Sequence, residues 1–100
     1  MAALAKLEES PAQLANAVYQ QIKAERMLKH IKALVMAAHN EKPVNAQERE
    51  AYSSPKYLAA LEEEATATAD LAKAKAEIEA ARLIVDVWRT EESSARQAAR

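Results

Sequence analysis

Apolar residues recur in two long stretches at alternating spacings of three and four, the pattern of helices that pair as coiled coils. In the first stretch the seven-residue repeats are Leu14, Gln21, Leu28 and Val35, interleaved with Ala17, Ala24, Ile31 and Ala38. In the second they are Tyr57, Glu64, Leu71, Ile78 and Val85, interleaved with Ala60, Ala67, Ala74, Ala81 and Trp88. One position of each series is nearly always alanine, which allows two helix backbones to approach closely. The pattern predicts two long helices packed along an Ala-rich seam.

The first long helix is predicted to begin at a capping signal. Ser10 is a favoured N-cap, Pro11 suits the first helical position, and Gln13 completes a capping box. No breaker follows until Pro43, so the helix is expected to span residues 10–40. Residues 1–9 leave two alternatives, a short helix that docks through Leu4 and Leu7 or a loose segment.

Two further capping signals follow the loop around Pro43. Asn45 with Glu48 predicts a second capping box and a short helix over residues 45–52. Ser54 with Pro55 predicts the start of the last helix, over residues 54–95. The polar tail from Thr90 to Arg100 is expected to fray. Residues 1–100 therefore form one predicted domain.

These elements define an all-α fold, an antiparallel helical hairpin with a short connecting helix. Each helix of a hairpin buries only one side, yet many apolar residues lie off the seam. They include Val18, Ile22, Met27, Leu34 and Met36 in the first helix, and Leu58, Leu61, Leu83, Ile84 and Val87 in the last.

The run Leu83 to Trp88 is apolar almost all round, so something is expected to cover it. A second copy would do so in a two-fold four-helix bundle. Residues 1–9 folding back with Leu4 and Leu7 against Trp88 would also do so, and the two are compatible. The predicted partner-binding or dimer-interface residues are Leu83, Ile84, Val87, Trp88, Leu58 and Leu61.

Composition narrows the functional classes. The chain has no glycine, which disfavours phosphate-binding loops, and no cysteine, which rules out disulfides and thiolate metal sites. His30 and His39 are nine residues apart, too far for a shared zinc site on one helix. The carboxylates show no nucleophile–base arrangement. We therefore expect no catalysis, metal, cofactor or small-molecule substrate. With no signal-peptide or membrane-spanning run, we expect a cytoplasmic protein with no membrane role.

Two basic groups each allow a structural and a functional interpretation. Lys23, Arg26, Lys29, His30 and Lys32 could pair with the acids Glu62, Glu63, Glu64 and Asp70, or could bind phosphate. Lys75, Arg82, Arg89 and Arg96 repeat every seven residues, with Arg100 just beyond, and form a basic ladder beside the seam. The ladder could pair with Glu8, Glu9 or Glu25, or could follow a nucleic-acid backbone while Trp88 stacks on a base.

The second half of the chain carries a family resemblance. The segment from Arg49 to Tyr57, a helical spacer, the segment Val87 to Thr90, and Arg96 resemble small, uncharacterised helical-hairpin proteins encoded by tailed bacteriophages. The resemblance implies a bacterial host cytoplasm and an accessory role in phage replication, recombination or counter-defence.

Two functions follow as expectations. The first is a non-enzymatic, homodimeric interaction or adaptor protein that binds a host or phage protein through a helical surface, with or without inhibiting it. The alternative is a nucleic-acid-binding accessory factor in phage replication or recombination that uses the basic ladder.

Overall fold

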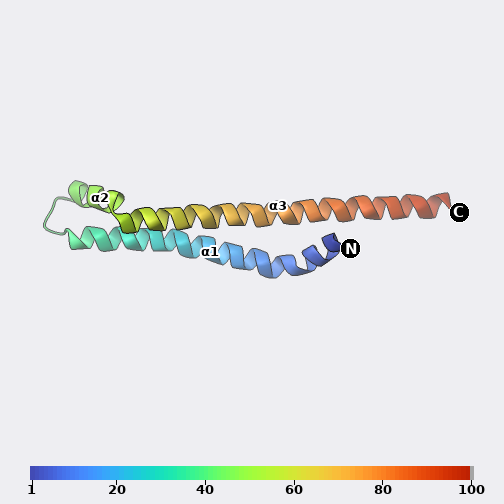
Figure 1. Cartoon of the computed structure of the whole chain (residues 1–100), viewed down its shortest axis with the longest axis horizontal. Coiled ribbons are helices and arrows are strands. Elements are labelled where there is room, and N and C mark those ends of the chain that lie inside the picture. The colour runs from blue at the N-terminus through green and yellow to red at the C-terminus, as the bar shows by residue number, and fades with distance from the viewer. Residues whose placement is uncertain (100) are drawn as a thin grey trace.

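The computed structural model describes residues 1–99, which form three helices and no strand: α1 (Ala2–Ala38), α2 (Val44–Ser53) and α3 (Pro55–Ala98). Helices α1 and α3 lie side by side and antiparallel, and α2 lies at the closed end of the hairpin (Figure 1). The molecule is a rod of 83 × 19 × 16 Å. The predicted all-α hairpin is confirmed. Arg100, predicted to extend the basic ladder, lies outside the described residues.

The predicted seam is the contact surface between α1 and α3. On α3, Ala60, Ala67, Ile78, Ala81 and Val85 are buried, and the other seam residues up to Val85 are half-buried. The α1 seam is half-buried from Leu14 to Val35. Ala38 and Trp88, the last members of the two series, are exposed. Because most of the fully buried residues are alanines, the seam is narrow, as the alanine series predicts.

The predicted start of the first helix at Ser10 is wrong. Helix α1 begins at Ala2 and passes through Pro11, and the Ser10 side chain makes no forward capping bond. Its hydroxyl instead donates back to the Leu7 carbonyl, 2.9 Å away. Of the two alternatives for residues 1–9, the docked helix is the one observed, continuous with α1. A proline inside a helix bends it, and the N-terminal turns of α1 turn toward α3 (Figure 1).

The seam itself extends into these first ten residues. Ser10 and Ala3 lie seven and fourteen residues before Ala17, and both are buried. Leu7 lies seven residues before Leu14 and is half-buried. Ala3, Ala81 and Val85 form the one buried cluster found among the described residues, and Leu4 and Leu7 pack against it. The N-terminal turns are therefore held by the same heptad contacts as the rest of α1.

The other helix boundaries differ from the prediction in detail. Helix α2 begins at Val44 with Pro43 as its N-cap, so the capping box expected at Asn45 does not form. Instead, the Pro43 carbonyl accepts the Ala46 and Gln47 amides at 3.0 Å. Ser54 precedes α3 as predicted, without a side-chain capping bond.

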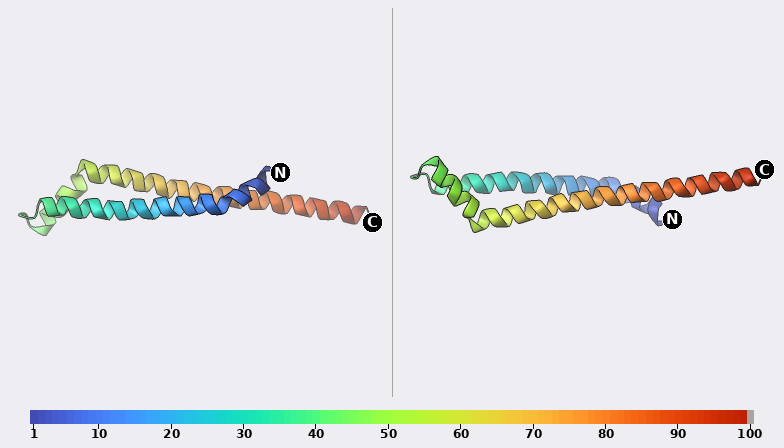
Figure 2. Two further views of the ribbon diagram at one scale, coloured as in Figure 1. Left: turned by 90° about the horizontal axis from the view of Figure 1, so that it is seen from below. Right: turned by 90° about the horizontal axis from the view of Figure 1, so that it is seen from above.

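The tail expected to fray from Thr90 is helical through Ala98. The α3 helix extends well past the N-terminus of α1 in all views (Figure 2). Every described residue from Asp86 onward is exposed. This segment, Asp86 to Ala98, is called the overhang below. Its exposure means that no other part of the described chain covers it.

Candidate interaction surface

The largest group of exposed apolar side chains lies where the N-terminus of α1 meets α3. Leu83, Ile84, Val87 and Trp88 are 60, 54, 57 and 42% exposed. With Met1 and Glu91 they line a shallow hollow on the surface. We call Met1, Leu83, Ile84, Val87 and Trp88 the open-end patch. Val85, inside the same run, is 3% exposed because it packs under the N-terminal turns of α1.

The N-terminal turns thus cover only one side of the apolar run. Leu4 and Leu7 pack on the cluster that contains Ala81 and Val85. The structure brings Met1, rather than Leu4 and Leu7, into the hollow that Trp88 lines. Sequence reasoning missed Met1, and the heptad spacing of Ala3 and Leu7 is the signal that would have placed it there.

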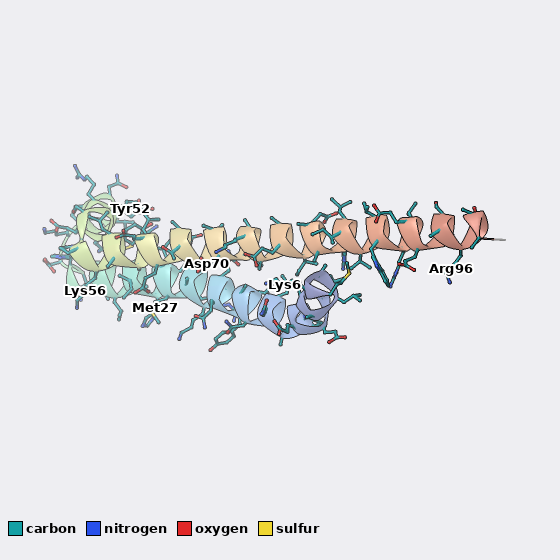
Figure 3. The ribbon with its side chains drawn as sticks, turned by 45° about the vertical axis from the view of Figure 1, so that its right-hand side comes forward. Lys6, Met27, Tyr52, Lys56, Asp70 and Arg96 are labelled. Atoms are coloured by element: carbon teal, nitrogen blue, oxygen red, sulfur yellow. The ribbon has the colours of Figure 1, made fainter. Side chains whose placement is uncertain are left out.

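One ion pair fastens these turns to α3. The Lys6 ammonium lies 2.8 Å from the Glu77 carboxylate, between the two helices (Figure 3). A hydrogen bond from Lys6 lowers the pKa of the Glu77 carboxyl below its ordinary 4.5, and the Lys6 charge adds to the effect. Lys6 and Glu77 also line an apolar hollow with Ala80 and Ile84, which adjoins the open-end patch.

Leu58 and Leu61, the other two predicted interface residues, lie at the opposite end of α3. They are 53 and 41% exposed. The structure does not bring them to the open-end patch, because they are separated from Val87 by more than seven turns of helix. The six predicted residues therefore lie toward opposite ends of α3.

The basic ladder projects from α3 into solvent. Lys75, Arg82, Arg89 and Arg96 are all exposed, and Arg96 lies on the overhang (Figure 3). Within the described part of the chain, the ion pairs expected with Glu8, Glu9 and Glu25 do not form. None of the four basic residues lines the hollow next to Trp88, so the structure does not place the indole on the ladder.

The second basic group also lacks its predicted partners. Lys23 shares a surface groove with Glu62, Glu63 and Asp70, yet no ion pair within 4 Å forms there among residues 1–99. Lys32 instead lies 4.8 Å from the centre of the Tyr52 ring, a cation–π contact. Tyr52 also packs edge-on against Tyr57, at 5.3 Å between ring centres. These aromatic contacts attach α2 to the two long helices.

One ion pair and one histidine contact close the loop before α2. The Lys42 ammonium lies 2.9 Å from the Glu50 carboxylate, and His39 approaches the same carboxylate at 3.9 Å. The hydrogen bond from Lys42 lowers the pKa of Glu50. Among the described residues, no three His, Cys, Asp or Glu side chains come close enough together to hold a metal ion. The structure also contains no described helix with the length and hydropathy of a membrane span.

Comparison with known proteins finds no matching family model, curated protein or solved structure. Function is therefore inferred from the exposed surfaces of the chain.

Proposed function

We propose that this chain is a self-associating helical interaction protein that binds another protein through its open-end patch and performs no catalysis. A single hairpin has a great deal of apolar surface left over. Thirteen large apolar side chains are exposed, and no large side chain is completely buried in the described residues. This imbalance is the observation that carries the proposal.

The total surface area supports the same conclusion. The chain exposes 7378 Å². A compact monomer of 11.0 kDa would expose about 5,600 Å² by the usual scaling with mass. The surplus, about 1,800 Å², exceeds the roughly 800 Å² that each partner contributes to a standard protein–protein interface. One or more interfaces would cover this surface.

The chemistry of the open-end patch favours a helical partner. Trp88 is the chain's only tryptophan, and tryptophan is enriched among the residues that dominate binding energy. Ile84 lies one helical turn before Trp88 and Val87 directly before it, beside the N-terminus of α1. An amphipathic helix with aliphatic side chains would pack on the overhang in line with α1. This is the helix-in-groove mode of recognition.

A matched pair of variants tests the binding role. The tagged chain, Trp88→Ala and Tyr19→Ala would be used to capture proteins from a bacterial lysate, and captured proteins would be purified and titrated individually. Tyr19 is the matched control because it is an exposed aromatic on α1, away from the patch. We expect a partner that loses at least tenfold affinity with Trp88→Ala and little with Tyr19→Ala. A partner set that is identical for all three chains would refute the proposal.

The cellular setting is part of the proposal. The resemblance to small phage-encoded hairpin proteins supports a bacterial cytoplasm and an inhibitory or adaptor role toward a host or phage protein. A bacterial lysate is the appropriate source of partners for this reason.

A second function has one observation in its favour. The basic ladder of Lys75, Arg82, Arg89 and Arg96 makes no ion pair within the described residues, so its charge is free to bind phosphates. This function predicts DNA or RNA binding that weakens steeply with salt and is lost when Arg82 and Arg89 become Glu. The matched control is Arg26→Glu with Lys29→Glu on α1. No binding at low salt would eliminate this alternative.

A further inference from the structure

Helix α3 has a second apolar stripe, on the side opposite the seam. Its members are Leu58, Leu61, Ala65, Ala69, Ala72, Ala76, Ala80, Leu83 and Val87. All nine are exposed, and none is charged or polar. Their spacings of three and four average close to 3.6, so the stripe runs straight along the helix for about 44 Å. We call these residues the outer stripe.

Helix α1 has no comparable stripe. Its outward face includes Tyr19 and Ile22, but the same face continues with Arg26 and Lys29. Charged residues in the middle of a face oppose its burial against an apolar surface. The outer stripe of α3 is therefore the long apolar face that a partner can cover without burying a charge.

The outer stripe is nearly symmetric about Ala72. Leu61 and Leu83 lie eleven residues on either side of Ala72, and Leu58 and Val87 lie fourteen and fifteen residues away. The four intervening positions are alanines whose distances from Ala72 agree to within one residue: Ala69 and Ala76 at three and four, and Ala65 and Ala80 at seven and eight. In a two-fold interface, residue i of one copy contacts residue j of the other and the reverse contact also forms. An antiparallel pair requires this mirror order.

We propose that the outer stripe is the self-association surface, on which a second copy of α3 packs antiparallel with the two-fold axis at Ala72. Leu61 then faces Leu83 of the other copy, and Ala65 lies within one residue of facing its Ala80. The central alanines allow close backbone approach, as the buried alanines of the α1–α3 seam already do. This inference gives a geometry to the self-association proposed above, and it rests on that proposed function.

The surface surplus is sufficient for this contact. Roughly 800 Å² per partner suffices for a stable interface, and the surplus over a compact monomer is about twice that. Burying the outer stripe would cover Leu58, Leu61, Leu83 and Val87, four of the thirteen exposed large apolar side chains. Trp88 follows Val87 by about 100° around the helix, so it stays outside the contact.

The arrangement makes the dimer bivalent. Trp88 lies sixteen residues beyond the axis at Ala72, so the two indoles would be about 48 Å apart at 1.5 Å per residue. The part of the open-end patch formed by Met1, Ile84 and Trp88 is then presented at both ends of the rod. Two such sites on one dimer raise the avidity for a dimeric or repeated partner without any new contact.

The outer stripe contains no charged residue, and this gives the dimer a recognisable salt response. Salt screens contacts between charges, including those to phosphates, but does not screen the burial of apolar surface. We expect self-association that persists as salt rises, whereas nucleic-acid binding weakens.

Cysteine cross-linking tests the register, because the chain has no cysteine of its own. Ala72→Cys places a thiol at the axis next to its own copy, within reach of a disulfide. Thr66→Cys is the control, an exposed α3 position off the outer stripe. Under mild oxidation we expect most Ala72→Cys chains to form covalent dimers and most Thr66→Cys chains to remain single.

A mixing experiment fixes the direction of pairing. Ala65→Cys and Ala80→Cys should each cross-link poorly alone, because their thiols lie more than 20 Å from their own copies. Mixed together, they should cross-link at least tenfold faster. Equal rates for Ala65→Cys alone and for the mixture would indicate parallel pairing and overturn the proposal.

The outcome is separable from that of the proposed function. Sedimentation velocity of the unmodified chain measures self-association, and Trp88-dependent capture measures partner binding. A monomeric chain that still binds a partner through Trp88 would overturn the antiparallel dimer alone. A dimer with the predicted cross-links and no partner would sustain this inference and overturn the binding role.

Discussion

The Ser10 hydroxyl donates to the carbonyl of Leu7, the group that Pro11 would bond if it had an amide hydrogen. The proline leaves that carbonyl without its helical donor, and the preceding serine supplies a replacement. Ser10 is 8% exposed, so water does not easily take this role. The pair explains how α1 passes through a proline that would otherwise end it.

Replacing Ser10 with Ala should destabilise the chain by about 1 kcal/mol, because it leaves a part-buried carbonyl unsatisfied. Urea unfolding followed by circular dichroism would measure the change. Ser53→Ala is the control, since Ser53 also bonds a backbone carbonyl but is exposed at the end of α2. An equal loss for both variants would show that Ser10 acts only through general helix effects.

Val85→Ala should cost about 2 kcal/mol in the free energy of unfolding. Val85 is 3% exposed and joins Ala3 and Ala81 in the buried cluster, so truncation leaves a cavity. Val44→Ala is the matched control, because Val44 is 61% exposed in α2 and the same atoms are removed. Because the same atoms are removed in both variants, an excess loss in Val85→Ala reports the burial of this side chain. Similar unfolding energies would contradict the packing of the N-terminal turns.

Docking of the N-terminal turns should depend on acid pH. The pKa of Glu77 is lowered in the folded chain by its hydrogen bond from Lys6. A carboxyl with a lowered folded pKa stabilises the fold fully above its ordinary pKa of 4.5, and the contribution disappears as the pH falls through the folded pKa. The protection factors of the amides from Ala5 to Leu7, which correct for the intrinsic pH dependence of hydrogen exchange, should therefore fall in acid.

The pH experiment has its own variants. Glu77→Gln should remove the acid dependence and leave these amides less protected at neutral pH. Glu79→Gln, an exposed α3 carboxyl that forms no ion pair among the described residues, should change neither. If the acid dependence of amide protection survives in Glu77→Gln, a group other than Glu77 causes it.

Trp88 provides a spectroscopic probe of the open-end patch. It is the only tryptophan and is 42% exposed, so its emission should be that of a hydrated indole. Binding of a partner helix should shift the emission to shorter wavelength, whereas self-association through the outer stripe should not. A blue shift that follows chain concentration alone would place Trp88 in the dimer contact.

The sequence predicted the hairpin and its seam because the heptad period is strong from Leu14 to Val35 and from Tyr57 to Val85. The N-terminal boundary was wrong because Ser10 and Pro11 are the residues of a helix start. The same two residues continue a helix when the serine bonds backward and the flanking turns are held by Ala3 and Leu7. Only the tertiary contact distinguishes these outcomes.

The side-chain surfaces were less predictable than the backbone. Leu83, Ile84 and Val87 were correctly placed off the seam, whereas Trp88, predicted as the last member of a seam series, is exposed. The pairing of Lys23 and Arg26 with the acids of α3, one of the two predicted alternatives, does not form, since a surface ion pair between long side chains gains little over hydration. Lys6 and Glu77 pair because the bend at Pro11 brings α1 close to α3 there.

The alanine seam has a consequence for how this chain tolerates mutation. Most proteins are destabilised by substitutions that shorten core side chains, but Ala60, Ala67 and Ala81 each have only a methyl group to remove. The destabilising substitutions at these positions are to larger side chains, which separate α1 from α3 along the rod. Sequence variation in this chain should therefore be freest in the identity of its polar residues and most restricted in the size of its smallest ones.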